Sequence, residues 1–108
     1  MASPLYKPLA SSFGADGTAE VTVTPPGGYD WHIRVTSVST TSTTNTTATV
    51  TVDGGFHEGT YQGNRDTSDT VFTLQDSVPL VCTWTGGTPG ARATLNLRGV
   101  QATAGTMT

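Results

Sequence analysis

Apolar and polar residues alternate along most of the chain from residue 18 onward. Residues 19–24 read AEVTVT, residues 31–36 read WHIRVT and residues 47–52 read TATVTV. A period of two places successive side chains on opposite faces of a strand, whereas an amphipathic helix needs a period near 3.6. No stretch of the sequence has a helical face of useful length, so the pattern predicts an all-β protein.

Turn segments rich in Gly and Pro separate the predicted strands. The turns are expected at residues 25–28 (PPGG), 53–55 (DGG, the composition of a tight hairpin) and 86–90 (GGTPG). The apolar positions change parity after Ser37, where Val38 is the next apolar residue, which predicts a bulge or a strand end. Further strands are expected at residues 56–62, 71–74, 80–85 and 91–100. About seven or eight short antiparallel strands at this spacing are typical of a single β-sandwich or a jelly-roll-like barrel.

Residues 1–17 (MASPLYKPLASSFGADG) depart from this pattern and predict an extended N-terminal arm. Pro4 and Pro8 lack a backbone donor and favour extended conformations in the residues before them, which opposes a helix. The arm is too apolar for a purely solvated tail. Its candidate contacts with a partner protein are Leu5, Tyr6, Leu9 and Phe13.

Thr is the most abundant residue, and its distribution affects the domain assignment. The chain of 108 residues contains 23 Thr and 8 Ser, and residues 39–47 read STTSTTNTT. This run could be a linker between two domains, but β-forming residues lie on both sides and it contains no Pro or Gly. Two strands joined around Asn45 are the better interpretation. We therefore expect one β-sandwich domain over residues 18–100, followed by a C-terminal tail at residues 101–108.

The charge of the chain argues against several partners. Charged residues make up 12% of the chain and the formal net charge is −3, whereas a typical globular protein has roughly 25% charged residues. Without a basic cluster the sequence predicts no nucleic-acid partner. No run approaches the ~20 apolar residues of a membrane span, and the first residues lack the apolar core of a secretory signal. We expect no membrane partner, and we expect the protein to be synthesised in a cytoplasm without being secreted.

The polar residues do not assemble into a predicted metal or cofactor site. A zinc site needs three or four converging ligands, and the chain offers only His32, His57 and scattered carboxylates. The segment Asn64–Asp69 has oxygen ligands suited to calcium, but it lacks the spacing of a known calcium loop, and such residues also form ordinary turns. We expect no cofactor, while calcium binding by Asn64–Asp69 stays open.

Catalysis is not predicted either. The sequence contains no G-x-S-x-G motif. Cys82 alternates in register with Leu80 and Trp84, which predicts a buried and unreactive thiol. A pair of glycosidase carboxylates would have to include Glu20 or Glu58, and neither lies in an apolar segment. The sequence therefore predicts a non-enzymatic protein.

Aromatic residues are the remaining candidates for ligand binding. Trp31 and Trp84 could stack on sugar rings, as in carbohydrate-binding β-sandwiches. They share parity with Ile33 and Leu80, which favours a place in the core. Tyr29 and Tyr61 border turns and are freer to be exposed.

Several segments together resemble a known class of protein. They are Trp31, VTSVSTT at 35–41, ATVTVDG at 48–54, Gly59-Thr60, Gly63-Asn64 and WTGGTPGA at 84–91, followed by Ala93-Thr94. This string resembles small Thr-rich structural proteins in the virions of tailed bacteriophages, particularly phages of actinobacterial hosts. The resemblance covers about residues 18–100, and its most specific part is the pattern W-T-G-G-x-P-G-x-x-A-T.

The resemblance implies a structural role in the virion and leaves head and tail open. A decoration protein that binds the outside of the head, often as a homotrimer, would combine a small β-rich body with an extended terminus. Its partners would be other copies of itself and the major capsid protein. A minor tail or baseplate component, with tail proteins as partners, and a carbohydrate-binding module used in host attachment are the alternatives. Assembly in the reducing cytoplasm of a bacterial host agrees with a single free Cys and no secretion signal.

Overall fold

The computed structural model describes residues 3–104, which form nine strands. In chain order these are β1 (Ser3–Ser12), β2 (Ala19–Val23), β3 (Tyr29–Thr40), β4 (Thr47–Val52), β5 (Phe56–Gln62), β6 (Arg65–Ser68), β7 (Phe72–Leu74), β8 (Leu80–Thr85) and β9 (Arg92–Thr103). The described residues form no helix, and hence none that could span a membrane. The prediction of an all-β protein is confirmed.

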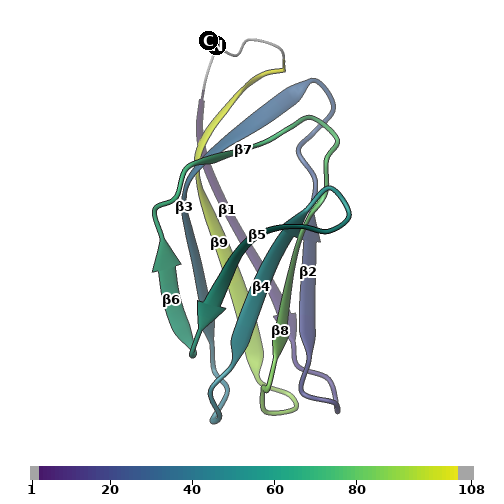
Figure 1. Ribbon diagram of the computed structural model, residues 1–108, viewed down its shortest axis with the longest axis vertical. Coiled ribbons are helices and arrows are strands. Elements are labelled where there is room, and N and C mark those ends of the chain that lie inside the picture. The colour runs from purple at the N-terminus through teal and green to yellow at the C-terminus, as the bar shows by residue number, and fades with distance from the viewer. Residues whose placement is uncertain (1–2, 105–108) are drawn as a thin grey trace.

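The strands form two antiparallel sheets that pack face to face (Figure 1). The β9 sheet has the order β1-β9-β3-β6, with β7 also paired to β3, and the β8 sheet has the order β2-β8-β4-β5. Most consecutive strands lie in different sheets, so the chain crosses repeatedly between the two layers. This is the connectivity of a jelly roll, and the predicted single β-sandwich is confirmed.

The core lies between the two sheets and follows from the alternation in the sequence. Every second residue of β2 and of β8 is buried. The largest fully buried side chains include Trp31, Ile33, Leu74, Leu80, Trp84, Leu95 and Leu97. Full burial of each such side chain contributes about 1.5–3 kcal/mol, so this layer is the main source of stability.

The predicted N-terminal arm is extended, but it is a strand of the sandwich rather than a separate arm. β1 pairs with β9 along its whole length, from Ser3 opposite Gln101 to Ser12 opposite Arg92. Pro4 and Pro8 cannot donate to a ladder, so they fit only an edge strand with their nitrogens facing away from β9. The same prolines hid this strand in the sequence, because proline within an apolar run weakens a strand assignment.

The predicted C-terminal tail begins later than expected. β9 continues to Thr103, which lies opposite Tyr29 of β3. The side chain of Gln101 adds to this pairing, because its Oε1 accepts a hydrogen bond of 2.8 Å from the indole nitrogen of Trp31. Of the expected tail, residues 101–103 therefore belong to the sandwich, and residues 105–108 lie outside the described residues.

One strand arises in the segment Asn64–Asp69, whose polar residues predicted a turn or a calcium-binding segment rather than a strand. β6 pairs with β3 over Thr36–Ser39. Its sequence, RDTS, contains no apolar residue and therefore gave no alternation to detect. Together with β1, this strand raises the number from the expected seven or eight to nine.

The predicted bulge exists, but it lies earlier in the chain. The register between β3 and β9 shifts between Ile33 and Val35, so Arg34 is the extra residue. The bulge puts Thr36, which is 1% exposed, and Val38 on the buried side. Because Val35 is apolar and Thr36 is polar, the sequence indicated a change of parity only at Val38.

The predicted hairpin at residues 53–55 is confirmed. Asp53 and Gly54 have φ values of 51° and 78°, and the nitrogen of Gly55 donates a 3.1 Å hydrogen bond to the carbonyl of Val52. Two successive residues with positive φ define the type I′ turn that suits the twist of a two-stranded hairpin. This turn connects β4 to β5.

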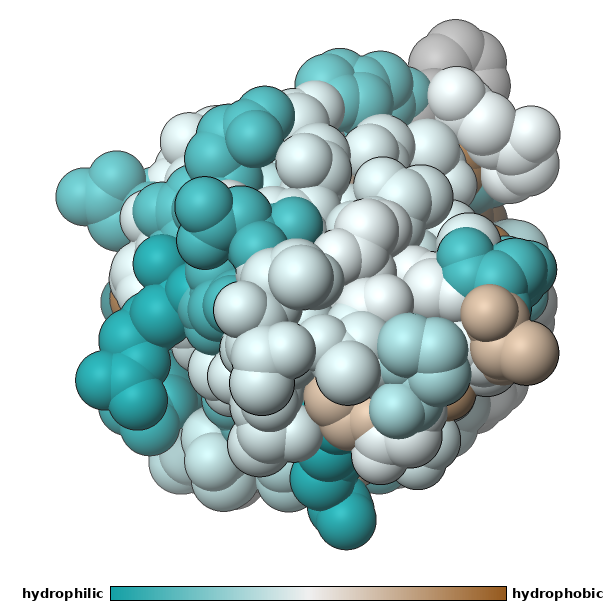
Figure 2. Space-filling view, turned by 90° about the horizontal axis from the view of Figure 1, so that it is seen from below, coloured by the Kyte–Doolittle hydropathy of each residue, from teal (hydrophilic) through white to brown (hydrophobic). Residues whose placement is uncertain are grey.

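The Thr- and Ser-rich run between β3 and β4 ties together the loops at the lower end of the molecule. The Oγ of Ser42 accepts a hydrogen bond of 3.0 Å from the nitrogen of Thr88, and the Oγ1 of Thr44 donates one of 2.6 Å to the carbonyl of Gly86. Figure 2 shows this end, whose middle is neither strongly hydrophilic nor hydrophobic. The run is thus part of one domain, as expected, and it binds the β8–β9 loop.

Candidate functional site

Three of the four predicted arm contacts pack against the protein's own core. Phe13 is 3% exposed, and its backbone nitrogen donates a 2.8 Å hydrogen bond to the carbonyl of Ala91. Leu5 and Leu9 are partly buried against the same core. Phe13 is too buried to contact a partner, and Leu5 and Leu9 turn part of their surface to the protein's own core, so these three residues make intramolecular contacts in the structure.

Tyr6 is the arm residue that remains accessible. Its side chain is 57% exposed and its ring centroid lies 5.0 Å from the guanidinium carbon of Arg98. The Tyr6 hydroxyl also donates a 3.3 Å hydrogen bond to the Oδ1 of Asn96. Tyr6 and Arg98 are directly opposite on β1 and β9, so they form a cation–π pair on the outer face of the β9 sheet.

The tryptophans lie in the core, as their parity predicted. Trp31 is 2% exposed and Trp84 is fully buried, so neither ring is available to stack on a sugar. Tyr29 is 41% exposed, as expected, but Tyr61 is buried. Burial raises the pKa of the Tyr61 hydroxyl, an effect that the neighbouring Thr36 and Ser68 hydroxyls oppose.

The histidines do not converge on a metal site. His57 is exposed and its Nε2 lies 2.7 Å from the Thr60 hydroxyl, while the Nδ1 of His32 lies 3.1 Å from the Thr73 hydroxyl in the other sheet. Within residues 3–104, no group of three or more His, Cys, Asp or Glu residues could hold a metal ion. Each histidine instead forms a hydrogen bond with a threonine: His57 with Thr60 on the same strand, and His32 with Thr73 on the neighbouring strand.

The segment considered for calcium uses the side-chain oxygens of Asn64 and Asp66 in internal hydrogen bonds. The Oδ1 of Asn64 accepts hydrogen bonds from the nitrogen and the hydroxyl of Thr46, at 3.1 and 2.9 Å. Its Nδ2 donates to the carbonyls of Ser42 and Thr44 at 3.1 and 2.9 Å. The carboxylate of Asp66 accepts from the nitrogens of Gln62 and Thr67 at 3.2 and 2.8 Å. Asn64 therefore fastens the β3–β4 loop to the start of β6.

Cys82 is fully buried between the sheets, as predicted. Desolvation raises the pKa of its thiol to about 12. A thiol with such a pKa is a poor nucleophile at neutral pH.

The two Glu residues lie on different strands, Glu20 on β2 and Glu58 on β5, which are separated by β8 and β4 in the β8 sheet.

A polar groove opens along one side of the sandwich, between the edge strands β5 and β6. It has a volume of about 360 Å³, and its lining includes Glu58, Tyr61, Asp66, Asp69 and Phe72. We call it the edge groove. Its three carboxylates give it a negative charge, and the fold brings Glu58 to the same groove as Asp66 and Asp69, which the sequence did not predict.

Threonine hydroxyl groups make up most of the outer face of the β8 sheet, which also carries Val81 and Glu20. Register places Thr47 opposite Thr85 and Thr49 opposite both Thr83 and Thr60. We call this surface the threonine face, and its members are Thr22, Thr47, Thr49, Thr51, Thr60, Thr83 and Thr85. Its two middle strands, β4 and β8, contain no charged residue.

The outer face of the β9 sheet carries most of the positive charge. Four of the five Lys and Arg residues project from it, and we call it the arginine face: Arg34, Arg65, Arg92 and Arg98. These four residues are far apart in the sequence, and no local pattern assigns them to one face. Two of them, Arg92 and Arg98, lie on β9. They could have been placed on one face, because they alternate with the buried residues Ala93, Leu95 and Leu97.

Comparison with known proteins supports the fold. No protein-family model matches the chain, and no curated protein matches it. One match is the crystal structure of the Drosophila NLP core, which was described as providing insight into pentamer formation and histone binding. It has a TM-score of 0.50 and 8% identity, and the match covers 91% of this chain and 97% of that chain. At this identity the likeness shows the fold alone.

Two carbohydrate-binding domains also match, with lower TM-scores. The N-terminal cellulose-binding domain of β-1,4-glucanase C from Cellulomonas fimi has a TM-score of 0.34 and 14% identity, over 93% of this chain and 80% of that chain. The CBM36-1 domain of a xylanase from the hindgut metagenome of Trinervitermes trinervoides has 0.29 and 13%, over 90% and 78%. These two likenesses carry no argument about function.

Proposed function

We propose that the protein is a non-enzymatic structural component of a tailed-bacteriophage virion, a decoration protein that binds the outside of the head. Other copies of the chain, as a homotrimer, and the major capsid protein are its partners. The sequence resemblance motivates this proposal. The jelly-roll fold agrees with it, since viral capsid proteins are among those that use this architecture, although many unrelated functions share one fold.

The observation that carries the proposal is the threonine face. A protein interface must desolvate both surfaces, and buried unpaired charges are costly while small hydroxyl groups cost much less. Thr49 and Thr83 lie side by side in the middle of this face. A surface with no charge on its two central strands is suited to close packing on a protein shell, and we assign the shell contact to it.

A minor tail or baseplate protein is the alternative within the same class, because the threonine face would pack equally well on a tail component. A carbohydrate-binding module is the second alternative. Since Trp31 and Trp84 are buried, such a module would depend on the exposed rings of Tyr6 and Tyr29. Saccharide binding that is lost on Tyr29→Ala would support this alternative.

Co-sedimentation with shells assembled from the major capsid protein of the phage that carries this gene tests the proposal. The wild-type chain is expected to pellet with the shells. The variant T49R/T83R, which puts two charges in the middle of the threonine face, is expected to stay in the supernatant.

The matched control is T67R, because Thr67 is an exposed residue of β6 on the outer face of the other sheet. It should bind shells like the wild type. If the wild-type chain fails to bind shells, or if T49R/T83R binds as well as T67R does, the proposed contact is wrong.

A further inference from the structure

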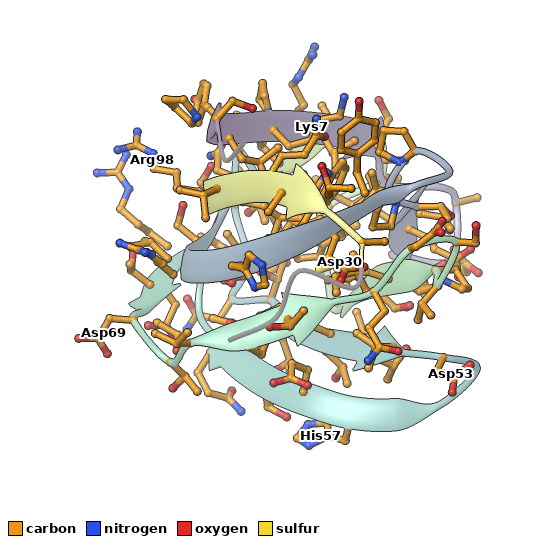
Figure 3. All side chains as sticks on the ribbon, turned by 90° about the horizontal axis from the view of Figure 1, so that it is seen from above. Lys7, Asp30, Asp53, His57, Asp69 and Arg98 are labelled. Atoms are coloured by element: carbon orange, nitrogen blue, oxygen red, sulfur yellow. The ribbon has the colours of Figure 1, made fainter. Side chains whose placement is uncertain are left out.

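Among the residues that the structure describes, the guanidinium groups of the arginine face have no acidic partner. Within residues 3–104, none of the four arginines forms an ion pair, and the cation–π contact of Arg98 with Tyr6 is the one side-chain interaction among them. The chain's fifth cation, Lys7, lies off this face, with its Nζ 5.8 Å from the centroid of the Trp31 ring. Figure 3 shows Arg98 projecting away from the body. The face therefore offers four unpaired positive charges to solvent.

The carboxylates lie elsewhere, and three of them line the edge groove. Two of these, Glu58 and Asp69, accept no hydrogen bond from any described residue. Successive side chains of β6 point to opposite sides, and this places its positive and negative residues on different surfaces. It places Arg65 opposite Ser39 on the outer face, and it turns Asp66 toward the groove.

The two surfaces adjoin along β6 and face different directions. Figure 3 shows Arg98 and Asp69 on the same flank of the molecule, projecting separately away from the body. Within one copy the charges of the two surfaces stay unpaired. Between two copies, the projecting cations of one surface are opposite in sign to the carboxylates of the groove.

We propose that the arginine face of one copy binds the edge groove of a second copy. Such a contact joins two different surfaces, so it is heterologous, and it builds a closed ring or an open chain according to the rotation between copies. The homotrimer of the proposed function would be one such ring. The inference itself depends only on the charges of this chain and holds whether or not the protein belongs to a virion.

The expected association is weak and sensitive to salt. Exposed charges contribute little per pair and are screened beyond about 8–10 Å at physiological ionic strength. Charge complementarity mainly guides orientation and speeds association. We therefore expect dissociation constants in the micromolar range or weaker, and at least about tenfold weaker association when the salt concentration rises from about 20 to 300 mM.

Sedimentation velocity of the full chain over a concentration series tests the proposal at both salt concentrations. Two variants reverse one surface each. R34E/R65E/R98E changes the net charge of the arginine face from +4 to −2, and E58R/D69R changes that of the groove from −3 to +1. Each variant alone should remain monomeric at low salt, because its two surfaces have the same sign. An equimolar mixture of the two should associate again, because each surface then meets its complement.

Lys7→Glu and Glu20→Arg are the matched controls, since they reverse charges outside both surfaces and should associate like the wild type. The proposal is overturned if the wild-type chain is monomeric at low salt, if the controls weaken association as much as the surface variants, or if the mixture fails to associate. Binding of duplex DNA by the arginine face in place of a second copy would overturn it too.

Discussion

Gly99 lies at the most crowded backbone contact of the sandwich. A Cβ at this position would overlap the carbonyl oxygen of His32 and would lie 3.1 Å from the Cα of Ile33. Both residues belong to β3, next to the bulge at Arg34. The absence of a side chain at Gly99 therefore allows the two strands to keep this pairing.

Gly99→Ala is expected to lower the free energy of unfolding by about 3 kcal/mol or more, because backbone atoms of β3 would have to move. Urea unfolding followed by tryptophan fluorescence measures this loss. Gly27→Ala is the control, since a Cβ there meets nothing within 4 Å, and its effect should stay within about 0.5 kcal/mol. Equal effects of the two substitutions would contradict the close approach.

Asn64 joins three segments of the chain through its amide. Asn64→Ala leaves the buried hydroxyl of Thr46 and two loop carbonyls without this partner. We expect a loss of about 2 kcal/mol or more in the free energy of unfolding. Asn45→Ala is the matched control, because Asn45 is exposed in the loop that Asn64 holds. If both substitutions had the same small effect in urea unfolding, the amide would not be important.

The thiol of Cys82 makes stability depend on pH. Its folded-state pKa is raised to about 12, above the value near 8.5 of an unfolded thiol. The contribution is therefore fully present below about pH 8.5 and is lost progressively as the pH rises from there toward 12, by about 1.4 kcal/mol per pH unit. Unfolding measured at pH 8, 9 and 10 should show this slope, and Cys82→Ala should reduce it. An identical slope in the variant would show that other groups cause it.

At the scale of the elements, β1 is where the structure changes the picture most. Deletion of residues 2–12 would leave the body intact if these residues formed a separate arm. Because β1 pairs with β9 over ten residues and Leu5 and Leu9 pack against the core, we expect the truncated chain to unfold or to lose several kcal/mol of stability. Circular dichroism and thermal unfolding measure the effect. If the truncated chain had wild-type stability, residues 2–12 would be a separate arm after all.

The elements that could be predicted are those whose apolar residues alternate. β2, β4 and β8 were located from alternation alone, and the Asp53-Gly54 turn from its composition. β6 could not be found in this way, since four polar residues become a strand only because β3 has a free edge there. The bulge at Arg34 was misplaced because Thr36 is polar and yet buried. The pairing of strands that are distant in the sequence determines where β6 and the bulge form, and the local sequence does not indicate this pairing.

The candidate surfaces were predicted less well than the fold. The tryptophans and Cys82 were assigned to the core correctly, since parity alone determines which face of a strand a residue occupies. Phe13 was interpreted as a partner contact because the arm is apolar, and Tyr61 as accessible because it borders a turn, but both side chains turn inward. The arginine face and the edge groove combine residues from several strands, so no single stretch of the sequence indicates them.

At the scale of the whole molecule, the low charge of the chain hides an uneven distribution. The net charge is −3, yet one sheet presents four arginines and the other presents a hydroxyl surface. The threonine face is suited to a neutral shell contact, and the arginine face and the edge groove are suited to contacts between copies. One small sandwich can thus support two kinds of contact, as a component of a regular surface lattice requires.

Separation of purified virions into heads and tails tests the central claim most directly. The virions are those of the phage that carries this gene, and the protein is quantified by mass spectrometry in each fraction. A decoration protein is expected to remain with the heads, in a constant ratio to the major capsid protein. Recovery with the tails, or absence of the protein from the virions, would contradict the account.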